Sequence, residues 1–265
     1  MPKKRNDPHR SILMAIAILS LFYVTGDWVA YAYIRAGSSP APAFAIAVAA
    51  VKYLASWLSC LFVWSIGNDR LDERDAFWLR AAFSFLVAAD TFMVLLFPVL
   101  TALGRSPSEA FNAAGMICFM AVQTCLIVRH WRNARSAYRG PGRGEAGRKR
   151  ALAKLAATEL FMVLIVAIPV TASYYLAARK PTPIMVVYGV YLVISLAVAW
   201  SALRRSFFPR RNAWMIALGM TSFFLCDVNV GLSGLSPVAT PLVWAFYTPA
   251  LILLAASGID YRKRA

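Results

Sequence analysis

Residues 214–235, WMIALGMTSFFLCDVNVGLSGL, form one apolar run that carries a single carboxylate, Asp227, near its middle. A helix needs about 20 apolar residues to cross a bilayer, so this stretch predicts a membrane-spanning helix. An ionised carboxylate at that depth costs at least about 2.5 kcal/mol. We therefore expect Asp227 to face protein, water or a bound partner rather than lipid.

A second apolar run, residues 77–100, repeats this arrangement. Its segment FSFLVAAD ends at Asp90, much as SFFLCD ends at Asp227. Two spans of the chain therefore each offer one acid to the interior of the membrane, where such acids mark functional sites by default. The two similar stretches also hint at a parallel internal repeat.

The composition places the whole chain among membrane proteins. Its 265 residues are 60% hydrophobic and 15% charged, with a mean hydropathy of +0.60, which is outside the range of soluble domains. The formal net charge is +16. Because Lys and Arg lie in short segments between apolar runs, we expect anionic lipid headgroups rather than nucleic acid as their partners. The four cysteines lie inside apolar runs and predict no disulfide framework.

Hydropathy predicts an all-α fold, a polytopic transmembrane helix bundle of about eight spans. Nearly all Lys and Arg fall in segments that a cytoplasmic N-terminus would place inside, whereas the outside loops carry Arg35, Arg105, Arg179 and Lys180. The positive-inside rule therefore predicts that both termini are cytoplasmic. The predicted spans are residues 11–34, 43–66, 77–100, 110–128, 152–177, 182–203, 214–235 and 241–257.

The chain is expected to form one integral membrane domain made of two four-span halves. A basic N-terminus, residues 1–10, precedes the first half, residues 11–129. A basic, glycine-rich linker, residues 130–151, leads to the second half, residues 152–258, and to a basic tail, residues 259–265. We expect the linker to be flexible and cytoplasmic. The positive charge of the linker is explained more simply if the linker fixes the topology and contacts lipid phosphates than if it has a dedicated binding role.

Four ionisable side chains are predicted at a similar depth in the membrane: Asp27, Lys52, Asp90 and Asp227. Each is costly alone and much less so when paired, so we expect a shared polar centre in which Lys52 neutralises an aspartate. One protonated acid beside one ionised acid is the arrangement that general acid-base catalysis requires. The alternative is a structural role, with hydrogen bonds worth about 0.6 kcal/mol each joining the helices. We favour that alternative for Asp27 or Glu159 alone, and function for Asp90 and Asp227 with Lys52.

Further side chains are candidates to line this centre. Tyr188 and Tyr247 carry hydroxyl groups that need partners inside a membrane. Gln123 ends a helix face on which small and aromatic residues recur every fourth position from Phe111. Most such aromatic residues pack against neighbours or anchor the helix at the membrane interface. The residues expected to support the two acids or to bind substrate are Lys52, Gln123, Tyr188, Tyr247 and Asp27.

The sequence predicts no metal and no cofactor. The two histidines, His9 and His130, are both predicted at the cytoplasmic side, which leaves no histidine within the membrane for a zinc site. No glycine-rich loop of the phosphate-binding type is present.

Between residues 51 and 258 the chain resembles the YhhN-like family of lysoplasmalogenases, multi-span membrane enzymes that hydrolyse the vinyl ether bond of lysoplasmalogens. Lys52 is similar to the lysine of the family's second span. The segment FSFLVAAD is similar to its first Gly-Asp segment, with Ala89 in place of the glycine. The spaced residues Phe111, Gly115 and Phe119 are similar to the following span, in which a histidine is expected where Gln123 stands.

The later spans extend the resemblance. VYGVYLVISLAVAW, residues 187–200, and ALGMTSFFLCD, residues 217–227, follow the family pattern, with Cys226 in place of a serine. Phe246 and Tyr247 match the final span, in which a glutamine is expected near Ala250.

The resemblance implies a hydrolase of a lysophospholipid substrate, surrounded by membrane lipids in a bacterial-type inner membrane. It implies that Asp90 and Asp227 divide the roles of acid and base, with Lys52 holding one of them ionised. No nucleic acid and no obligate protein partner are expected. Two alternatives are a proton-coupled membrane transporter and a family member that binds lipid without cleaving it.

Overall fold

The computed structural model describes residues 8–106, 108–131, 183–203, 208–233 and 236–263, together with the isolated positions 147, 157 and 161. These parts of the chain are all helical, and the one β-type contact within them is a bridge between Arg70 and Ile259. Seven of the described helices are long and apolar enough to cross a membrane. The chain is thus an all-α protein with the character of an integral membrane protein.

The seven helices coincide with seven of the eight predicted spans to within a few residues. The eighth predicted span, residues 152–177, and most of the linker lie outside the described residues. The third span continues from α3 through a π-helix, η2, into α4. The elements are α1 (Pro8–Arg35), α2 (Pro42–Ser65), α3 (Glu73–Asp90), η2 (Thr91–Leu96), α4 (Phe97–Ala102), α5 (Glu109–Trp131), α8 (Pro183–Ala202), α9 (Arg210–Leu232) and α10 (Ala239–Ala256).

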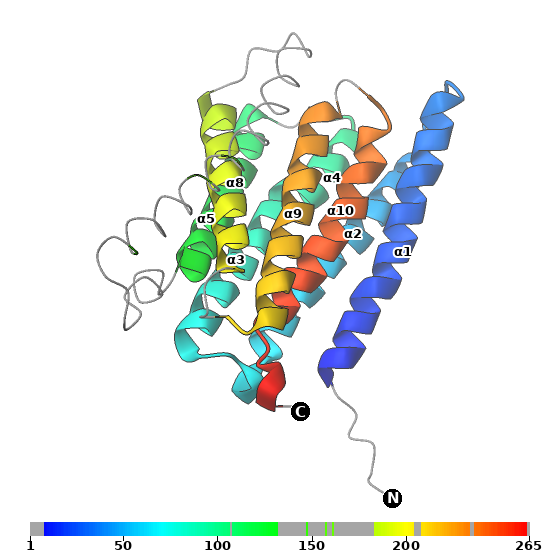
Figure 1. Ribbon diagram of the computed structural model, residues 1–265. Helices are drawn as coiled ribbons and strands as arrows, with labels where there is room; N and C mark the ends of the chain where they lie inside the picture. Colours follow the sequence, from blue (N-terminus) through cyan, green and yellow to red (C-terminus); the bar gives the residue numbers. More distant parts are fainter. Residues whose placement is uncertain are drawn as a thin grey trace, which may run out of the picture.

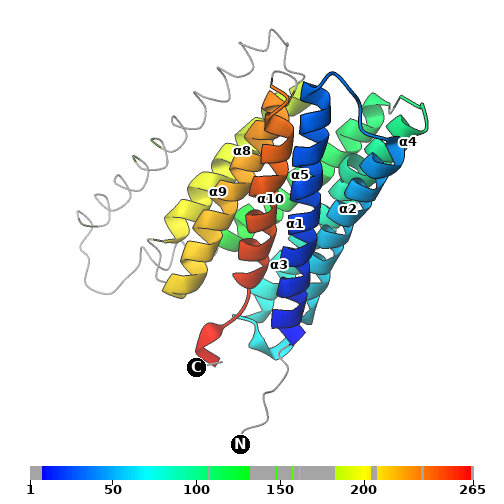
Figure 2. The same ribbon diagram turned by 90° about the vertical axis from the view of Figure 1, so that its right-hand side faces the viewer.

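The described helices pack around one another as a bundle (Figure 1). Helices α2, α3, α5, α8, α9 and α10 contact one another in that order, and α10 also contacts α2. Helix α1 lies on the outside against α2 and α10, as the turned view makes clear (Figure 2). The start of α1 and the short 3-10 helix η3 (Tyr261–Lys263) lie at the same end of the bundle.

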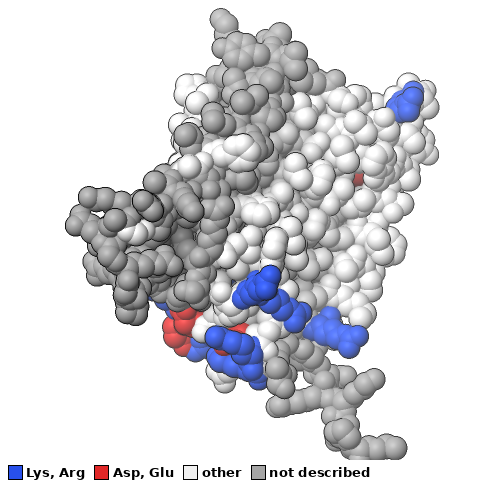
Figure 3. Space-filling model, in the orientation of Figure 1, with Lys and Arg blue, Asp and Glu red and all other residues white. Residues whose placement is uncertain are grey.

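Charged and apolar side chains are segregated along the bundle axis. On the face drawn in Figure 3, most of the charged groups gather at the end where η3 lies. A broad belt with little charge extends from there toward the other end, near which one basic group lies. Large apolar side chains are exposed on this protein, including Leu21 at 71% and Phe22 at 68%. Exposed apolar residues in such numbers match a surface that faces lipid.

A buried ion pair joins the start of α3 to the end of α5. Arg129 donates hydrogen bonds of 2.9 and 3.0 Å to the two carboxylate oxygens of Asp75, and both side chains are fully buried. The same guanidinium donates to the hydroxyl of Ser257 at 2.8 Å and to its carbonyl at 3.1 Å. This bidentate geometry is the strong form of an arginine-carboxylate pair.

Helix α9 joins this cluster from its own first turn. The side-chain amide of Asn212 donates to the carbonyls of Ser257 and Ile259 at 2.9 and 2.7 Å. Those carbonyls follow the last turn of α10, where helix carbonyls lack partners within the helix. The residues Asp75, Arg129, Asn212 and Ser257, which we name the terminal cluster, therefore connect α3, α5, α9 and α10 at one end of the bundle.

Candidate active site

Asp90 lies in the interior because of the pattern of its helix. Leu79, Phe83 and Leu86 lie on the buried face of α3, and Asp90 follows one turn after Leu86 with no exposed surface. The π-helix η2 begins at the next residue. Single π-turns inside a helix are rare and recur at functional sites. The backbone thus marks the same position that the sequence singles out.

Two hydroxyl groups hold one oxygen of the Asp90 carboxyl. Oδ2 accepts hydrogen bonds from Oγ of Ser56 on α2 at 2.5 Å and from the hydroxyl of Tyr247 on α10 at 2.6 Å. Within the described residues Oδ1 is buried and has no hydrogen-bond partner. Tyr247, a predicted supporting residue, therefore contacts one of the two acids. Asp90 retains one free oxygen for a ligand or a proton.

Ser56 is a site residue that the sequence analysis did not select. It lies one helical turn after Lys52 on α2, so the two residues share a face, and it is fully buried. Its spacing of four residues from an intramembrane lysine is the sequence signal that could have identified Ser56 as a site residue.

Asp227 lies on α9, on a neighbouring part of the bundle. Its Oδ2 accepts a hydrogen bond of 2.9 Å from the hydroxyl of Tyr188 on α8, and the residue is half-buried. Tyr188, also a predicted supporting residue, therefore contacts the second acid. Asp227 lies close enough to Asp90 for the two carboxyls to interact electrostatically.

The two acids occupy matching heights in the bundle. Asp90 follows Asp75 on α3 by the same number of residues as Asp227 follows Asn212 on α9, about 22 Å at the rise of an α-helix. Asp75 and Asn212 both belong to the terminal cluster, which fixes a common level. The expectation that the two acids lie at a similar depth agrees with this geometry.

Lys52 pairs with Asp27 rather than with either candidate catalytic acid. Its Nζ donates to Oδ1 of Asp27 at 2.7 Å and lies 4.2 Å from the centre of the Trp244 ring. Both members of the pair are buried, at 8% and 7% exposure. The expectation that Lys52 keeps Asp90 or Asp227 ionised is corrected by this pairing, because a lysine ammonium bound by one carboxylate and one aromatic face is already neutralised.

Gln123 is buried on α5 but joins neither acid by a hydrogen bond. Its side chain has no exposed surface, and neither the amide oxygen nor the amide nitrogen has a partner among the described residues. An unpartnered buried amide costs about 1–3 kcal/mol. The structure therefore places Gln123 in the interior without showing what it binds.

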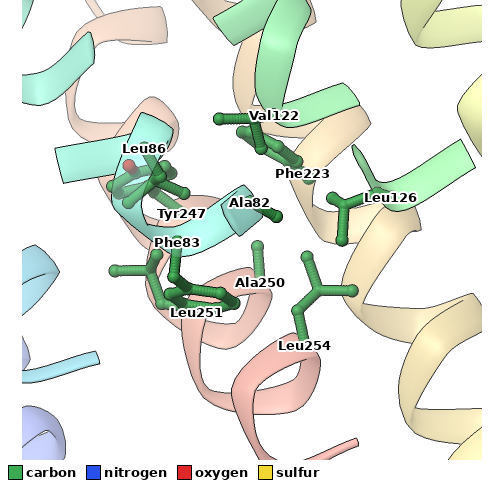
Figure 4. A pocket seen from close by; sticks show the side chains of 10 residues that line it. All are labelled: Ala82, Phe83, Leu86, Val122, Leu126, Phe223, Tyr247, Ala250, Leu251 and Leu254. Carbon is green, nitrogen blue, oxygen red and sulfur yellow. The ribbon is translucent and has the colours of Figure 1, made fainter. Parts of the chain in front are cut away.

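A small apolar cavity lies beside Tyr247, one of the two hydroxyl partners of Asp90. Its lining comes from α3, α5, α9 and α10 (Figure 4). The volume is about 10 Å³, close to what one water molecule needs. The cavity is too small for a lipid in this conformation. The residues that line it are Ala82, Phe83, Leu86, Val122, Leu126, Phe223, Tyr247, Ala250, Leu251 and Leu254.

The arrangement offers carboxyls and hydroxyls for its chemistry. Among the described residues no group of three or more His, Cys, Asp or Glu side chains is placed to hold a metal ion. Cys226 precedes Asp227 directly and is a buried free thiol.

No family model, no curated protein and no solved structure matches this chain.

Proposed function

We propose that this protein is an integral membrane hydrolase that cleaves the vinyl ether bond of lysoplasmalogen-type lysolipids. The observation that supports the proposal is that each of the two acids accepts a hydrogen bond from a tyrosine hydroxyl of another helix, Asp90 from Tyr247 and Asp227 from Tyr188. Two carboxyls within electrostatic reach favour a state in which one is protonated and the other ionised. That is the requirement of acid-base cleavage. The resemblance to the YhhN-like family supports the choice of substrate.

We assign the acid role to Asp90. Both hydrogen bonds from Ser56 and Tyr247 reach Oδ2, which leaves Oδ1 to carry a proton. A proton on Oδ1 is not engaged by any described side chain and can be delivered to the β-carbon of a vinyl ether. This protonation forms an oxocarbenium ion and leaves Asp90 as a carboxylate.

Asp227 takes the base role. Its half-buried carboxyl is more accessible than that of Asp90 and makes its one described hydrogen bond to Tyr188. A carboxylate there stabilises the cation and takes a proton from the water that attacks it. The hemiacetal then collapses to a fatty aldehyde and a glycerophospho-alcohol. One water is consumed and no redox partner is needed.

Substrate access requires the helices to separate. Asp90 has no exposed surface, and the neighbouring cavity holds about one water. The lining of that cavity is apolar except for the Tyr247 hydroxyl, which suits a hydrocarbon chain. We propose that a single-chain lipid enters sideways from the bilayer, with its headgroup remaining near the membrane surface.

We also propose eight spans, with both termini on the cytoplasmic side of a bacterial-type inner membrane. Arg129 at the end of α5 and Asn212 at the start of α9 meet in the terminal cluster, and Trp200 near the end of α8 contacts Trp214 at the start of α9. Helices α5 and α8 therefore run in the same direction, as the eight-span topology requires. Arg210, Arg211, Arg262 and Lys263 lie at that basic end, which is the cytoplasmic one by the positive-inside rule.

The test is release of fatty aldehyde from a lysoplasmalogen by the full chain in detergent. We expect turnover by the wild type and a loss of about 10²- to 10⁴-fold in Asp90→Asn and in Asp227→Asn. Asp260→Asn is the matched control, because Asp260 pairs with Arg262 outside the spans. Folded wild-type protein without turnover would contradict the proposal, and full turnover in either variant would remove that acid from the mechanism.

Transport is a second candidate, and one observation favours it. The buried Asp27–Lys52 pair has an aspartate oxygen, Oδ2, without a described hydrogen-bond partner, and it lies outside the acid pair that hydrolysis needs. Buried ion pairs of this kind serve as proton relays in carriers. Proton flux into proteoliposomes that Asp27→Asn abolishes, with no aldehyde release, would favour the transporter. Bound lysolipid that remains intact would favour a non-catalytic lipid-binding protein.

A further inference from the structure

Arg80, a cation inside the third span, has no acidic partner among the described residues. Lys52 pairs with Asp27 and Arg129 pairs with Asp75, whereas Arg80 on α3 forms no ion pair within the described chain. Arg80 lies about two turns, or roughly 10 Å, inside the helix. An arginine at that depth needs an anion, a route to water, or both.

An exposed tryptophan holds the Arg80 side chain. The guanidinium carbon lies 5.2 Å from the centre of the Trp64 ring, and Trp64 is 54% exposed. Phe77 and Leu61, one turn from Arg80 and Trp64 on their own helices, are also exposed. The arginine therefore lies on the lipid-facing side of the contact between α2 and α3.

Most of the hydrogen-bonding capacity of Arg80 is unused. Nη2 donates to the Trp64 carbonyl at 3.5 Å, the limit of a hydrogen bond, and Nε is buried without a described partner. A guanidinium has five N–H donors in a planar fork that matches phosphate oxygens. Capping the last turn of α2 is the structural alternative, but one long hydrogen bond satisfies little of that fork.

We propose that Arg80 and Trp64 form a binding site for the phosphate of an anionic phospholipid. The site lies toward the end of the bundle that carries Arg70, Arg74, Arg262 and Lys263, where a positive potential favours an anionic headgroup over a zwitterionic one. Tryptophan suits the headgroup level because its ring is apolar and its N–H is polar. The lipid chains then lie along Phe77 and Leu61. This site is independent of the proposed hydrolase.

The test is native mass spectrometry of the full chain, titrated with phosphatidylglycerol and with phosphatidylcholine. We expect tighter binding of phosphatidylglycerol, and binding at least about tenfold weaker in Arg80→Gln. Arg74→Gln is the matched control, because Arg74 is an exposed arginine of the same helix for which no aromatic contact is described. Affinity for phosphatidylglycerol should fall much less in Arg74→Gln than in Arg80→Gln, because Arg74 adds only to the general positive potential. Trp64→Leu should show a smaller loss than Arg80→Gln.

Equal losses in Arg74→Gln and Arg80→Gln would overturn the site, since they would show diffuse attraction alone. Unchanged affinity in Arg80→Gln would also overturn it and leave Arg80 as a helix cap. Thermal unfolding of each variant checks the fold. If Arg80→Gln fails to fold, Arg80→Lys and Trp64→Leu decide the matter, because the first keeps the charge without the fork and the second keeps the fork without the ring.

Discussion

Tyr247 of α10 donates a hydrogen bond of 2.6 Å to Oδ2 of Asp90 on α3, across 157 positions of sequence. Both residues are buried. A hydrogen bond to a neutral carboxyl contributes about 0.5–1.5 kcal/mol, so this contact matters for the fold as well as for the proposed chemistry. The tyrosine ring also packs against Trp244 and Phe223, with ring centres 5.3 and 6.1 Å apart.

Tyr247→Phe separates these two roles. The phenyl ring keeps the packing, while Asp90 loses one of its two donors. We expect the free energy of unfolding to fall by about 1–3 kcal/mol and aldehyde release to fall about tenfold or more. Tyr53→Phe is the control, because Tyr53 bonds the Thr91 hydroxyl at 2.9 Å and bonds no acid among the described residues. Turnover that stays at the wild-type level in Tyr247→Phe would remove the hydroxyl from the mechanism.

The Asp27–Lys52 pair should behave as a closed electrostatic unit. Lys52→Met or Asp27→Asn alone leaves a buried charge without its partner, at a cost of about 3–5 kcal/mol. The double variant removes both charges, so we expect it to regain most of that loss. Denaturant unfolding of the four proteins measures the coupling. Additive losses in the double variant would show that the two residues stabilise the bundle separately.

Aldehyde release by the same four proteins tests the corrected role of Lys52. Since Lys52 contacts Asp27 and Trp244, we expect the double variant to retain turnover. If the double variant folds but has lost turnover, the ion pair is needed for catalysis and the original expectation for Lys52 stands.

The sequence predicted the helices well because their cause is local. Lipid and protein interior both demand apolar side chains, so each crossing appears as a run of about 20 apolar residues whatever its neighbours are. The predicted span of residues 77–100 thus falls within α3, η2 and α4. The π-helix inside it was not predicted, because residues Thr91–Leu96 carry no local signal that distinguishes a π-turn from an α-turn.

The pairings inside the bundle were harder to predict because they are tertiary. Asp90 and Asp227 stood out as isolated acids in apolar runs. No feature of the neighbouring sequence, however, predicts that Lys52 forms its ion pair with Asp27. Asp75 and Arg129 were missed for a different reason. Each lies at the charged end of a span, where hydropathy makes them indistinguishable from loop residues, although the structure buries both completely.

Breaking the terminal cluster should cost more than breaking an exposed pair. Asp75→Asn leaves the fully buried guanidinium of Arg129 without its counter-ion, and we expect a loss of about 3–5 kcal/mol in the free energy of unfolding. Arg262→Gln is the comparison, because Arg262 is 70% exposed in its pair with Asp260 and such pairs are worth about 0–1 kcal/mol. Similar Tm values for the two variants would show that the cluster is not a main support of the bundle.

Two glycines should respond to alanine with opposite signs. A Cβ at Gly219 of α9 would lie 2.9 Å from Cγ of Leu254 and 3.2 Å from Cβ of Leu253, so Gly219→Ala should destabilise the protein by about 1–3 kcal/mol. A Cβ at Gly189 of α8 would meet no heavy atom of the described residues within 4 Å. Gly189→Ala should therefore gain up to about 1 kcal/mol from helix propensity. Thermal unfolding of both variants checks the prediction, which fails if the two shifts have the same sign.

Gln123 offers a test of whether the interior keeps a polar group for function. Its amide is fully buried and neither polar atom has a described partner. Leucine has a similar volume and no polar atom, so Gln123→Leu should raise the free energy of unfolding by about 1–3 kcal/mol if the amide has no partner in the folded protein. Gln123→Glu is the matched variant, since a buried carboxylate without a partner should lower it.

Turnover measured on the same variants then shows whether the Gln123 amide serves the substrate or the stability of the fold. Stabilisation of Gln123→Leu together with a loss of aldehyde release would mean that the amide is retained for the substrate, since natural sites accept instability for function. Stabilisation with full turnover would show that the Gln123 amide contributes neither to stability nor to activity, and would remove Gln123 from the candidate site. Destabilisation would show instead that the amide has a partner, such as an ordered water, and a water-filled interior at this level would then be the feature to examine.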